Sequence, residues 1–355
     1  MTSTIVVGGG LMGASAAWHL ARRGHDVTLL ERFAPGHDRG SSHGTSRIFR
    51  LAYPDPLYVG LAARALTEWR RLEHETGRSV LTLTGGVDHG PDAETRPVYE
   101  TLRAAGHTAT WLAPAEVAER WPGLRVDGTA VFHADAGRLH ADDAVAALWN
   151  AARAHGADLR PGVRVTRIVR RAGGVDVITG DEDVVRADVA VVAVGGWAPS
   201  VLRECGIPAP ELRVTQEQPA HFPAADPLAW PSFIHHGGTE IYGLGSVDGV
   251  KVGLHGAGPV VDPDHRDRTV DDSTERTLAE YAARWLPGVD ATHPESLTCL
   301  YTTTPDHDFV IDRHGPVVVL AGCSGHGFKF GALVGELAAD LVEEKPGIPR
   351  FSLTR

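Results

Sequence analysis

The residues Thr4-Ile5-Val6-Val7-Gly8-Gly9-Gly10-Leu11-Met12-Gly13 are the most informative part of the sequence for the architecture of the protein. Its apolar residues predict a buried strand, and Gly8, Gly10 and Gly13 follow with the spacing G-x-G-x-x-G. In this pattern the first glycine permits a tight turn, the second lets a pyrophosphate approach the backbone, and the third lets helix and strand pack closely. A helix predicted over residues 11–23 would point its free N–H groups at the phosphates. The stretch therefore predicts a strand–turn–helix unit that binds a dinucleotide.

A second strand and an acidic residue follow at the distance that this pattern requires. Residues 26–30, Asp-Val-Thr-Leu-Leu, predict the strand, and Glu31 closes it 18 positions after Gly13 (31 − 13 = 18). A carboxylate about 20 residues past the glycines is expected to bind the adenosine ribose. Together these features predict a Rossmann-like α/β domain. The alternative is a tight turn in an ordinary α/β protein.

A second unit of the same kind lies near the C-terminus. Residues 316–322, Pro-Val-Val-Val-Leu-Ala-Gly, predict a buried strand, a glycine-containing turn follows over residues 323–329, and a helix is predicted over about 330–343. Residues 188–197 predict a further apolar strand in the centre of a parallel sheet. Two strand–turn–helix units from opposite ends of the chain indicate one ligand held by both, and we expect that ligand to be FAD.

Composition limits the class of protein. The chain has 355 residues, 43% hydrophobic and 22% charged, which is typical of a globular enzyme with two domains. A formal net charge of −11 argues against nucleic acid or an anionic membrane as the main partner. The three cysteines lack metal-ligand spacing, so we expect no disulfide framework, no metal site and a reducing, cytoplasmic location. No apolar run is long enough to span a membrane.

The order of the predicted elements indicates a discontinuous FAD-binding domain. We assign residues 1–84, 140–207 and 306–355 to it, and residues 85–139 and 208–305 to an inserted substrate domain with a mixed or antiparallel sheet. Helices are predicted over residues 58–77, 93–105, 142–155 and 272–285, and a hairpin over residues 164–170 and 174–179.

Residues 40–50 form a Gly- and Ser-rich loop that carries Arg47 and Arg50. Arginine suits bidentate recognition of a carboxylate or phosphate, but both side chains could equally lie on a solvated surface. Lys329 in the C-terminal turn presents the same choice between an anion-binding residue and an ordinary first-turn lysine. On the predicted strand 250–255, Lys251 and His255 share one face, and the pattern alone favours the solvent for Lys251.

The sequence pattern alone gives little support for a chemical role of Tyr242 or Cys299. Tyr242 lies on a predicted strand, where tyrosine is more often a packing residue than a catalytic one. Residues 296–302 predict one strand on which Cys299 and Tyr301 share a face, and a lone cysteine in a strand is usually an inert small hydrophobe.

Taken together, these segments resemble monomeric sarcosine oxidase and N-methyl-L-tryptophan oxidase, within the larger class typified by D-amino acid oxidase. The combination of Cys299-Leu300-Tyr301-Thr302 with Gly325-His326-Gly327-Phe328-Lys329-Phe330 is more specific than the glycine spacing. The matching stretches are spread over the chain: residues 8–13, 40–50, 193–197, 242–255, 299–312 and 322–330.

The resemblance implies a role for each matching residue. Cys299 matches the cysteine bonded to the flavin 8α-methyl group, Arg50 and Lys329 match the pair that binds the substrate carboxylate, and Lys251 matches the lysine that assists reaction with O₂. The expected catalytic residues are Lys251, Arg47, His255, Tyr242 and Tyr301. The residues expected to contact FAD are Gly8, Gly10, Leu11, Met12, Gly13, Glu31, Arg32, Ser42, His43, Arg47, Val165, Cys299, Gly325, Gly327, Phe328 and Lys329.

The implied activity is oxidation of a secondary amine of amino-acid type, with an imine and H₂O₂ as products and a monomer as the working unit. Three alternatives stay open: an oxidase of a cyclic imino acid, a dehydrogenase with an acceptor other than O₂, and a flavin-binding module without catalysis. Thr45 departs from the acidic residue of the family pattern, and residues 208–236 match nothing in it. Substrate identity is therefore the least determined feature.

Overall fold

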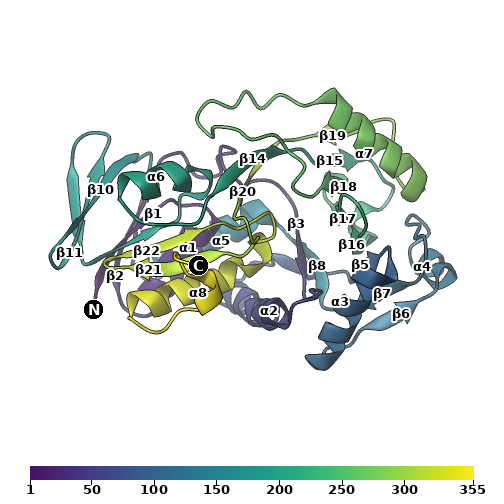
Figure 1. The fold of residues 1–355 in the computed structure, drawn as a ribbon, viewed down its shortest axis with the longest axis horizontal. Coiled ribbons are helices and arrows are strands. Elements are labelled where there is room, and N and C mark those ends of the chain that lie inside the picture. The colour runs from purple at the N-terminus through teal and green to yellow at the C-terminus, as the bar shows by residue number, and fades with distance from the viewer.

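The computed structural model describes residues 1–355 and has a mixed α/β fold (Figure 1). Its first sheet has six strands in the order β21-β22-β13-β1-β2-β9, all parallel except for β21. The strands are β21 (Val310–His314), β22 (Val317–Ala321), β13 (Val189–Val192), β1 (Ser3–Val7), β2 (Asp26–Glu31) and β9 (Asp158–Pro161). The predicted central strand is β13, which lies between β1 and β22 and so joins the two ends of the chain.

The two faces of this sheet are covered differently, because successive side chains point to opposite faces of a strand. Val6 of β1 packs in a core with helices α1 (Leu11–Arg22), α2 (Pro56–Thr76), α5 (Ala141–Ala154) and α8 (Gly331–Val342). Its neighbours Ile5 and Val7 pack against a three-stranded sheet and helix α6. The elements of the second face are β10 (Val165–Arg171), β11 (Gly174–Thr179), β12 (Val184–Ala187) and α6 (Ala198–Glu204). The predicted hairpin is therefore confirmed, as β10 and β11.

The second large sheet has eight strands and is mixed. Strands β5 and β16 pair in parallel, whereas its other pairs are antiparallel. In order the strands are β19 (Glu295–Ser296), β15 (Ala220–Phe222), β18 (Gly249–Leu254), β17 (Ile241–Ser246), β16 (Ser232–His235), β5 (Gly86–His89), β7 (Ala130–His133) and β6 (Thr110–Leu112). All its strands come from the segments assigned to the substrate domain, so the domain boundaries given above are kept as a proposal.

Two small sheets correct the sequence analysis. Residues Arg47–Arg50, expected in a loop, form β3, which pairs with β8 (Ala136–Leu139), and β4 (Leu81–Leu83) completes the sheet. The single strand expected over residues 296–302 is two strands. Its first part is β19, and its second is β20 (Cys299–Thr303), which pairs with β14 (Arg213–Glu217). The chain leaves one sheet for another between them, which alternation of residue types cannot reveal.

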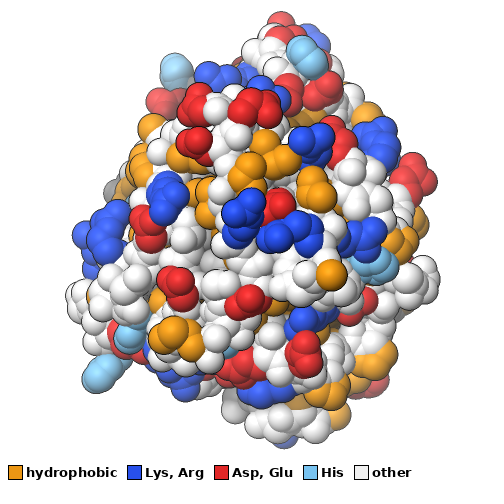
Figure 2. Space-filling view, turned by 90° about the vertical axis from the view of Figure 1, so that its left-hand side faces the viewer, with side chains coloured by type: hydrophobic (Ala, Val, Ile, Leu, Met, Phe, Trp, Pro, Cys, Tyr) orange, Lys and Arg blue, Asp and Glu red, His pale blue; other side chains and the backbone are white.

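The six helices predicted from the sequence agree with the structure to within about two residues. They are α1 (Leu11–Arg22), α2 (Pro56–Thr76), α3 (Asp92–Ala104), α5 (Ala141–Ala154), α7 (Asp272–Trp285) and α8 (Gly331–Val342). Two short helices, α4 (Pro114–Arg120) and α6, were not predicted. None of them is both long and apolar enough to cross a bilayer. On the face shown in Figure 2, acidic and basic side chains are interspersed rather than gathered by sign.

Candidate active site

One large cavity extends from the glycine turn after β1 to the eight-stranded sheet. Its volume is about 740 Å³, within the range of about 300–1,000 Å³ that is typical of ligand sites. Every site residue predicted from the sequence lines this cavity except Gly13. The lining comes from both ends of the chain and from the residues between them, so the two strand–turn–helix units do meet at one space.

The glycine turn has the geometry that its spacing predicts. Gly8 has φ +99°, and a Cβ there would lie 2.5 Å from the carbonyl oxygen of Ala193. A Cβ on Gly13 would lie 1.9 Å from the carbonyl oxygen of Gly8, so only glycine lets the helix approach the strand. At Gly10 the nearest atom is the Ser42 Oγ at 3.1 Å, and the backbone there is open to the cavity. These residues fit the pyrophosphate of a dinucleotide.

Glu31 is held by the turn itself. Its Oε2 accepts a hydrogen bond from the Gly9 N–H at 2.6 Å, and its Oε1 accepts one from the Phe33 N–H at 2.8 Å. Burial alone would raise the pKa of this carboxyl, but hydrogen bonds from His37 and from these two amides hold the pKa below its ordinary value. The charged carboxylate lines the cavity, and Oε2, which has the Gly9 N–H as its one partner, keeps a second lone pair for a ribose hydroxyl.

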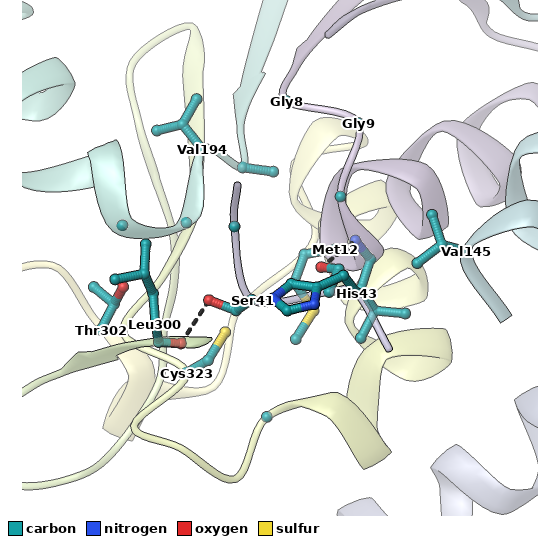
Figure 3. Close-up of a pocket in the computed structure, with 18 of the residues that line it drawn as sticks. Gly8, Gly9, Met12, Ser41, His43, Val145, Val194, Leu300, Thr302 and Cys323 are labelled. Carbon is teal, nitrogen blue, oxygen red and sulfur yellow. Dashed lines mark hydrogen bonds between the residues drawn. The ribbon is translucent and has the colours of Figure 1, made fainter. Parts of the chain in front are cut away.

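The loop after β2 is shaped by Arg47. Its guanidinium donates hydrogen bonds to three backbone carbonyls of the loop, those of Ser41, His43 and Ser46, at 2.7–2.9 Å. Figure 3 shows Ser41 and His43 between the glycine turn and β20, with the Ser41 Oγ donating to the Leu300 carbonyl at 2.6 Å. The Nε2 atom of His43 is buried and has no protein partner. An unsatisfied buried nitrogen beside a cavity fits a polar group of a ligand.

The remaining residues of the nucleotide end have ordinary partners. Ser42 accepts a hydrogen bond from the Leu11 N–H at 3.1 Å, which ties the loop to the start of α1. Arg32 forms an ion pair with Asp264 at 2.6 Å. Met12 and Val165 contribute apolar surface to the cavity wall.

Lys251 contradicts the expectation of a solvent-facing lysine. It is 4% exposed, lies in the middle of β18, and its Nζ donates to the Ser46 carbonyl at 3.4 Å. Burial, and then the nearby charge of Arg47, lower its pKa to about 7. The alternation of residue types was correct, because Val250 and Val252 pack on the other face in a core with α7. The face of Lys251 is covered too, since it borders the cavity.

Arg50 and Lys329 come from distant segments and border one part of the cavity. The Nζ of Lys329 donates to the Tyr53 hydroxyl at 2.9 Å and to the His326 carbonyl at 2.8 Å. Arg50 forms an ion pair with Asp88 at 2.8 Å. Lys329 has no carboxylate within ion-pair distance, and burial, followed by the charge of Arg50, lowers its pKa well below the ordinary value. An anion bound beside Lys329 would raise this pKa again and favour the charged form.

Three aromatic residues complete this part of the cavity. Tyr242 stands opposite Gly253 on the neighbouring strand, and a Cβ at that glycine would lie 2.5 Å from the tyrosine hydroxyl. Tyr301 uses Gly325 in the same way, since a Cβ there would lie 2.2 Å from its ring. The rings of His255 and Tyr301 are 5.6 Å apart. The glycines thus make room for the rings, which gives Gly325 a role beyond its positive φ of 74°.

All three cysteines of the chain, Cys205, Cys299 and Cys323, border the cavity. Cys299 lies on β20 and is 7% exposed, and burial raises its pKa. Cys323 lies in the C-terminal turn, where burial raises its pKa to about 11, and Figure 3 shows it near Leu300. Gly327 lies against Cys323, and Phe328 packs beneath the Arg47 guanidinium at 5.5 Å.

Sequence reasoning missed three polar residues of the site. Asp88 is 1% exposed and lies within 2.8 Å of Arg50 and 2.9 Å of His236. Tyr53 receives the Lys329 hydrogen bond. Glu240 lines the cavity just before β17. An aspartate beside Val87 in an apolar strand was the one available signal for Asp88, whereas nothing local distinguishes Tyr53 or Glu240.

The chain is similar to known proteins over its whole length. The sequence profile of a family described as FAD dependent oxidoreductase matches residues 3–341. The monomeric sarcosine oxidase of Streptomyces avermitilis is 39% identical over 95% of this chain and 92% of its own. The N-methyl-L-tryptophan oxidase of Yersinia pestis is 31% identical over 99% of this chain and 98% of its own.

Solved structures agree in fold. NikD, described as an unusual amino acid oxidase essential for nikkomycin biosynthesis, superposes with a TM-score of 0.88 at 27% identity, over 99% of this chain and 97% of its own. A glycine oxidase from Geobacillus kaustophilus gives a TM-score of 0.85 at 25% identity, over 100% of this chain and 98% of its own. The expected combination of a Rossmann-like FAD domain and a second domain is confirmed.

Proposed function

This chain belongs to the family of FAD dependent oxidoreductases and acts on amines, and from that premise we propose that it oxidises a secondary amine of amino-acid type, such as sarcosine or another N-methyl amino acid. A C–H bond beside nitrogen is oxidised, the resulting imine is hydrolysed by water, and O₂ is reduced to H₂O₂. The names of its sarcosine and N-methyl-L-tryptophan oxidase relatives support this substrate class.

The observation that carries the proposal is the position of Lys329. Its amine is buried and has only neutral partners, a hydroxyl and a carbonyl. Burial lowers its pKa, and an anion beside it would raise that pKa and favour the charged form, so the cavity favours a ligand that brings a negative charge. Arg50 borders the same space, and a carboxylate between the two cations would fix which C–H bond meets the cofactor. Asp88 orients Arg50 from behind through its ion pair.

FAD, when bound, supplies the group that accepts a hydride equivalent. The residues that would hold its nucleotide part are Gly8, Gly10, Gly13, Leu11, Met12, Glu31, Arg32, Ser42, His43 and Val165. Arg47, Gly325, Gly327 and Phe328 would border its ring, and Cys299 would bind the ring covalently. Tyr242, His255 and Tyr301 would form the wall that faces the substrate amine.

Lys251 would serve the reaction with O₂. Its ammonium group is enclosed, and a fixed cation in a site without water stabilises negative charge more strongly than it does in solution. O₂ gains negative charge when it takes an electron, whereas the amine loses electrons in the other half of the reaction. The charge of Lys251 therefore favours an oxidase over a dehydrogenase.

A substrate screen under anaerobic conditions tests this function. The purified holoenzyme is mixed with N-methyl amino acids, cyclic imino acids and simple amines, and bleaching of the oxidised flavin absorbance is followed. We expect bleaching by an N-methyl amino acid, and H₂O₂ after O₂ is admitted. Bleaching by cyclic imino acids alone would favour that alternative substrate class, and reduced enzyme that reacts with a dye but not with O₂ would favour a dehydrogenase.

We also propose that the protein works as a monomer. Relatives from Streptomyces avermitilis and Bacillus carry the name monomeric sarcosine oxidase and match nearly the whole chain. Size-exclusion chromatography with light scattering should give the mass of one chain, and a stable dimer at assay concentrations would contradict the proposal.

A further inference from the structure

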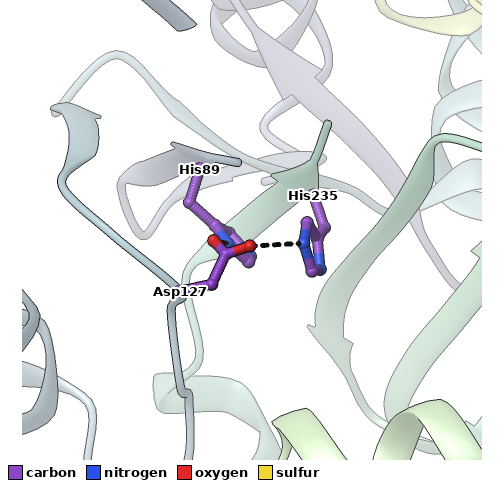
Figure 4. A group of neighbouring side chains, drawn as sticks. All are labelled: His89, Asp127 and His235. Carbon is purple, nitrogen blue, oxygen red and sulfur yellow. Dashed lines mark hydrogen bonds and ion pairs between the residues drawn. The ribbon is translucent and has the colours of Figure 1, made fainter. Parts of the chain in front are cut away.

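Two histidines and an aspartate converge on the eight-stranded sheet, outside the cavity described above. His89 ends β5 and His235 ends β16, at paired positions of the two parallel strands. Asp127 reaches both rings from the loop before β7 (Figure 4). None of the three residues lines the cavity. Since side chains alternate across a strand, His89 points away from its neighbour Asp88, which holds Arg50 on the cavity side.

The two distances from Asp127 to the histidines suit coordination better than hydrogen bonding. The Asp127 carboxylate lies 3.3 Å from the His89 Nδ1 and 3.5 Å from the His235 Nε2. All three groups have a ligand atom within 4.8 Å of the others. Ligand atoms about 2.0–2.1 Å from a tetrahedral Zn²⁺ stand about 3.3–3.4 Å apart, whereas N–H···O hydrogen bonds are usually about 2.9–3.0 Å long.

The surroundings also suit a metal site. The other nitrogen of His235, Nδ1, lies 3.2 Å from the Tyr281 hydroxyl, the kind of outer contact that fixes the tautomer of a metal-bound histidine. His89 is fully buried, and its Nε2 has no protein partner. Its other ring nitrogen, Nδ1, contacts the Asp127 carboxylate. The Asp127 side chain is 41% exposed, which leaves an entry path and room for a water ligand.

We propose that His89, Asp127 and His235 form a binding site for a divalent transition metal, with Zn²⁺ as the ion that this ligand set fits, and with water in the fourth position. Two imidazoles and a carboxylate are a common set for this ion. No metal site was expected from the sequence, because the three cysteines lack metal-ligand spacing. The site instead joins segments far apart in the chain, and it would fasten β5, β16 and the Asp127 loop behind the residues that hold Arg50.

Calorimetric titration of the holoenzyme, after dialysis against EDTA, tests the proposal with Zn²⁺ alone. We expect one Zn²⁺ per chain with a dissociation constant in the micromolar range or tighter, and at least a tenfold weaker affinity in Asp127→Asn and in His235→Gln. Asp290→Asn is the matched control, because Asp290 also lies beside a histidine, His293 at 2.7 Å, but on the exposed surface. It should bind Zn²⁺ as the wild type does.

Melting of the wild-type holoenzyme gives a second measurement that needs no variant. Zn²⁺ should raise the melting temperature, whereas Mg²⁺, which prefers oxygen ligands, should leave it unchanged. If the EDTA-dialysed wild type does not bind one Zn²⁺ per chain, the proposal is overturned. Equal affinity in the wild type and Asp127→Asn would also overturn it, because this result would place the ion elsewhere and leave the three residues as a hydrogen-bonded cluster.

Discussion

The two ends of the cavity differ in the groups that they offer to a ligand. At the nucleotide end, glycines bring the backbone close to the ligand, and the Glu31 carboxylate already accepts hydrogen bonds at both of its oxygens. At the opposite end, side-chain charge dominates. Lys251 and Lys329 are buried there, and neither forms an ion pair with a carboxylate.

The two ends therefore bind their ligands in different ways. The nucleotide end offers close backbone and a carboxylate held by hydrogen bonds, so it can bind its ligand by shape and backbone contacts. The opposite end is electrostatically incomplete, because two of the three lysines in the chain are enclosed in it without an anion. The central claim is that a substrate carboxylate completes this end. The following predictions test each end separately.

The largest expected effect concerns attachment of the flavin. Cys299→Ser should release all FAD when the protein is denatured with acid, whereas the wild type and Cys323→Ser should retain yellow colour in the pellet. Cys205 also borders the cavity, so Cys205→Ser should retain the colour too, and the three variants together identify the attachment site. A flavin peptide that contains Cys323, or full release from the wild type, would refute attachment through Cys299.

Lys251→Met should slow reoxidation of the reduced enzyme by at least about 100-fold, equivalent to about 2.7 kcal/mol of transition-state stabilisation. The substitution removes the charge but keeps the side-chain length. Reduction by substrate, followed anaerobically by stopped flow, should slow much less. Lys345→Met is the control, because this lysine is exposed and should leave both half-reactions unchanged. Equal losses in the two half-reactions would mean that Lys251 has a structural role.

The same lysine predicts a pH dependence. Its pKa is lowered to about 7 in the protein alone, and the protonated form carries the useful charge. The reoxidation rate should therefore fall as pH rises past the pKa, which negative charge on the reduced cofactor would move upward. Stopped-flow reoxidation between pH 6 and pH 10 measures it. The Lys251→Met variant should show no such decline, and an identical decline in that variant would assign it to another group.

Lys329→Met should weaken binding of an amino-acid substrate by roughly 10-fold to 150-fold, since a hydrogen bond to a charged group contributes about 1.5–3 kcal/mol. The apparent dissociation constant from anaerobic flavin reduction measures this effect. An amine without a carboxylate should bind the variant and the wild type alike. If both substrates lose affinity equally, the ammonium group does not contact the carboxylate.

The smallest effect tests the nucleotide end. Gly13→Ala places a Cβ against backbone, 1.9 Å from the Gly8 oxygen, and should destabilise the protein by about 1–3 kcal/mol. Gly60→Ala is the matched control in the exposed part of α2, where nothing lies within 4 Å. It should be neutral or stabilising by up to about 1 kcal/mol. Urea unfolding compares the two, and equal stabilities would show that close packing at Gly13 is unimportant.

The sequence predicted the nucleotide end well because its determinants are local. The strand, the glycines and Glu31 lie within one short stretch, and each has a conformational requirement that few other residues meet. The long helices were equally easy to predict, since the spacing of their apolar residues follows from the faces that they bury. The resemblance to a known family then named the residues at the other end.

The opposite end could not be derived from local patterns. Alternation placed Lys251 and Val252 on opposite faces of β18, but it could not tell that α7 covers one face and the cavity borders the other. The ion pair between Arg50 and Asp88 joins two sheets, and the spacing of residues along the chain cannot predict it. Contacts between distant segments decide burial, and burial decides the chemistry of a charged group.

The most direct test of the central claim compares matched substrates on the wild-type enzyme. Anaerobic stopped flow gives the apparent dissociation constant and the rate of flavin reduction for N-methyl amino acids and for the same amines without the carboxylate, such as sarcosine and dimethylamine. The account predicts at least about tenfold tighter binding of the acid in each pair that reduces the flavin. Equal affinity for acid and amine would contradict it, because the buried cations would then serve something other than the substrate.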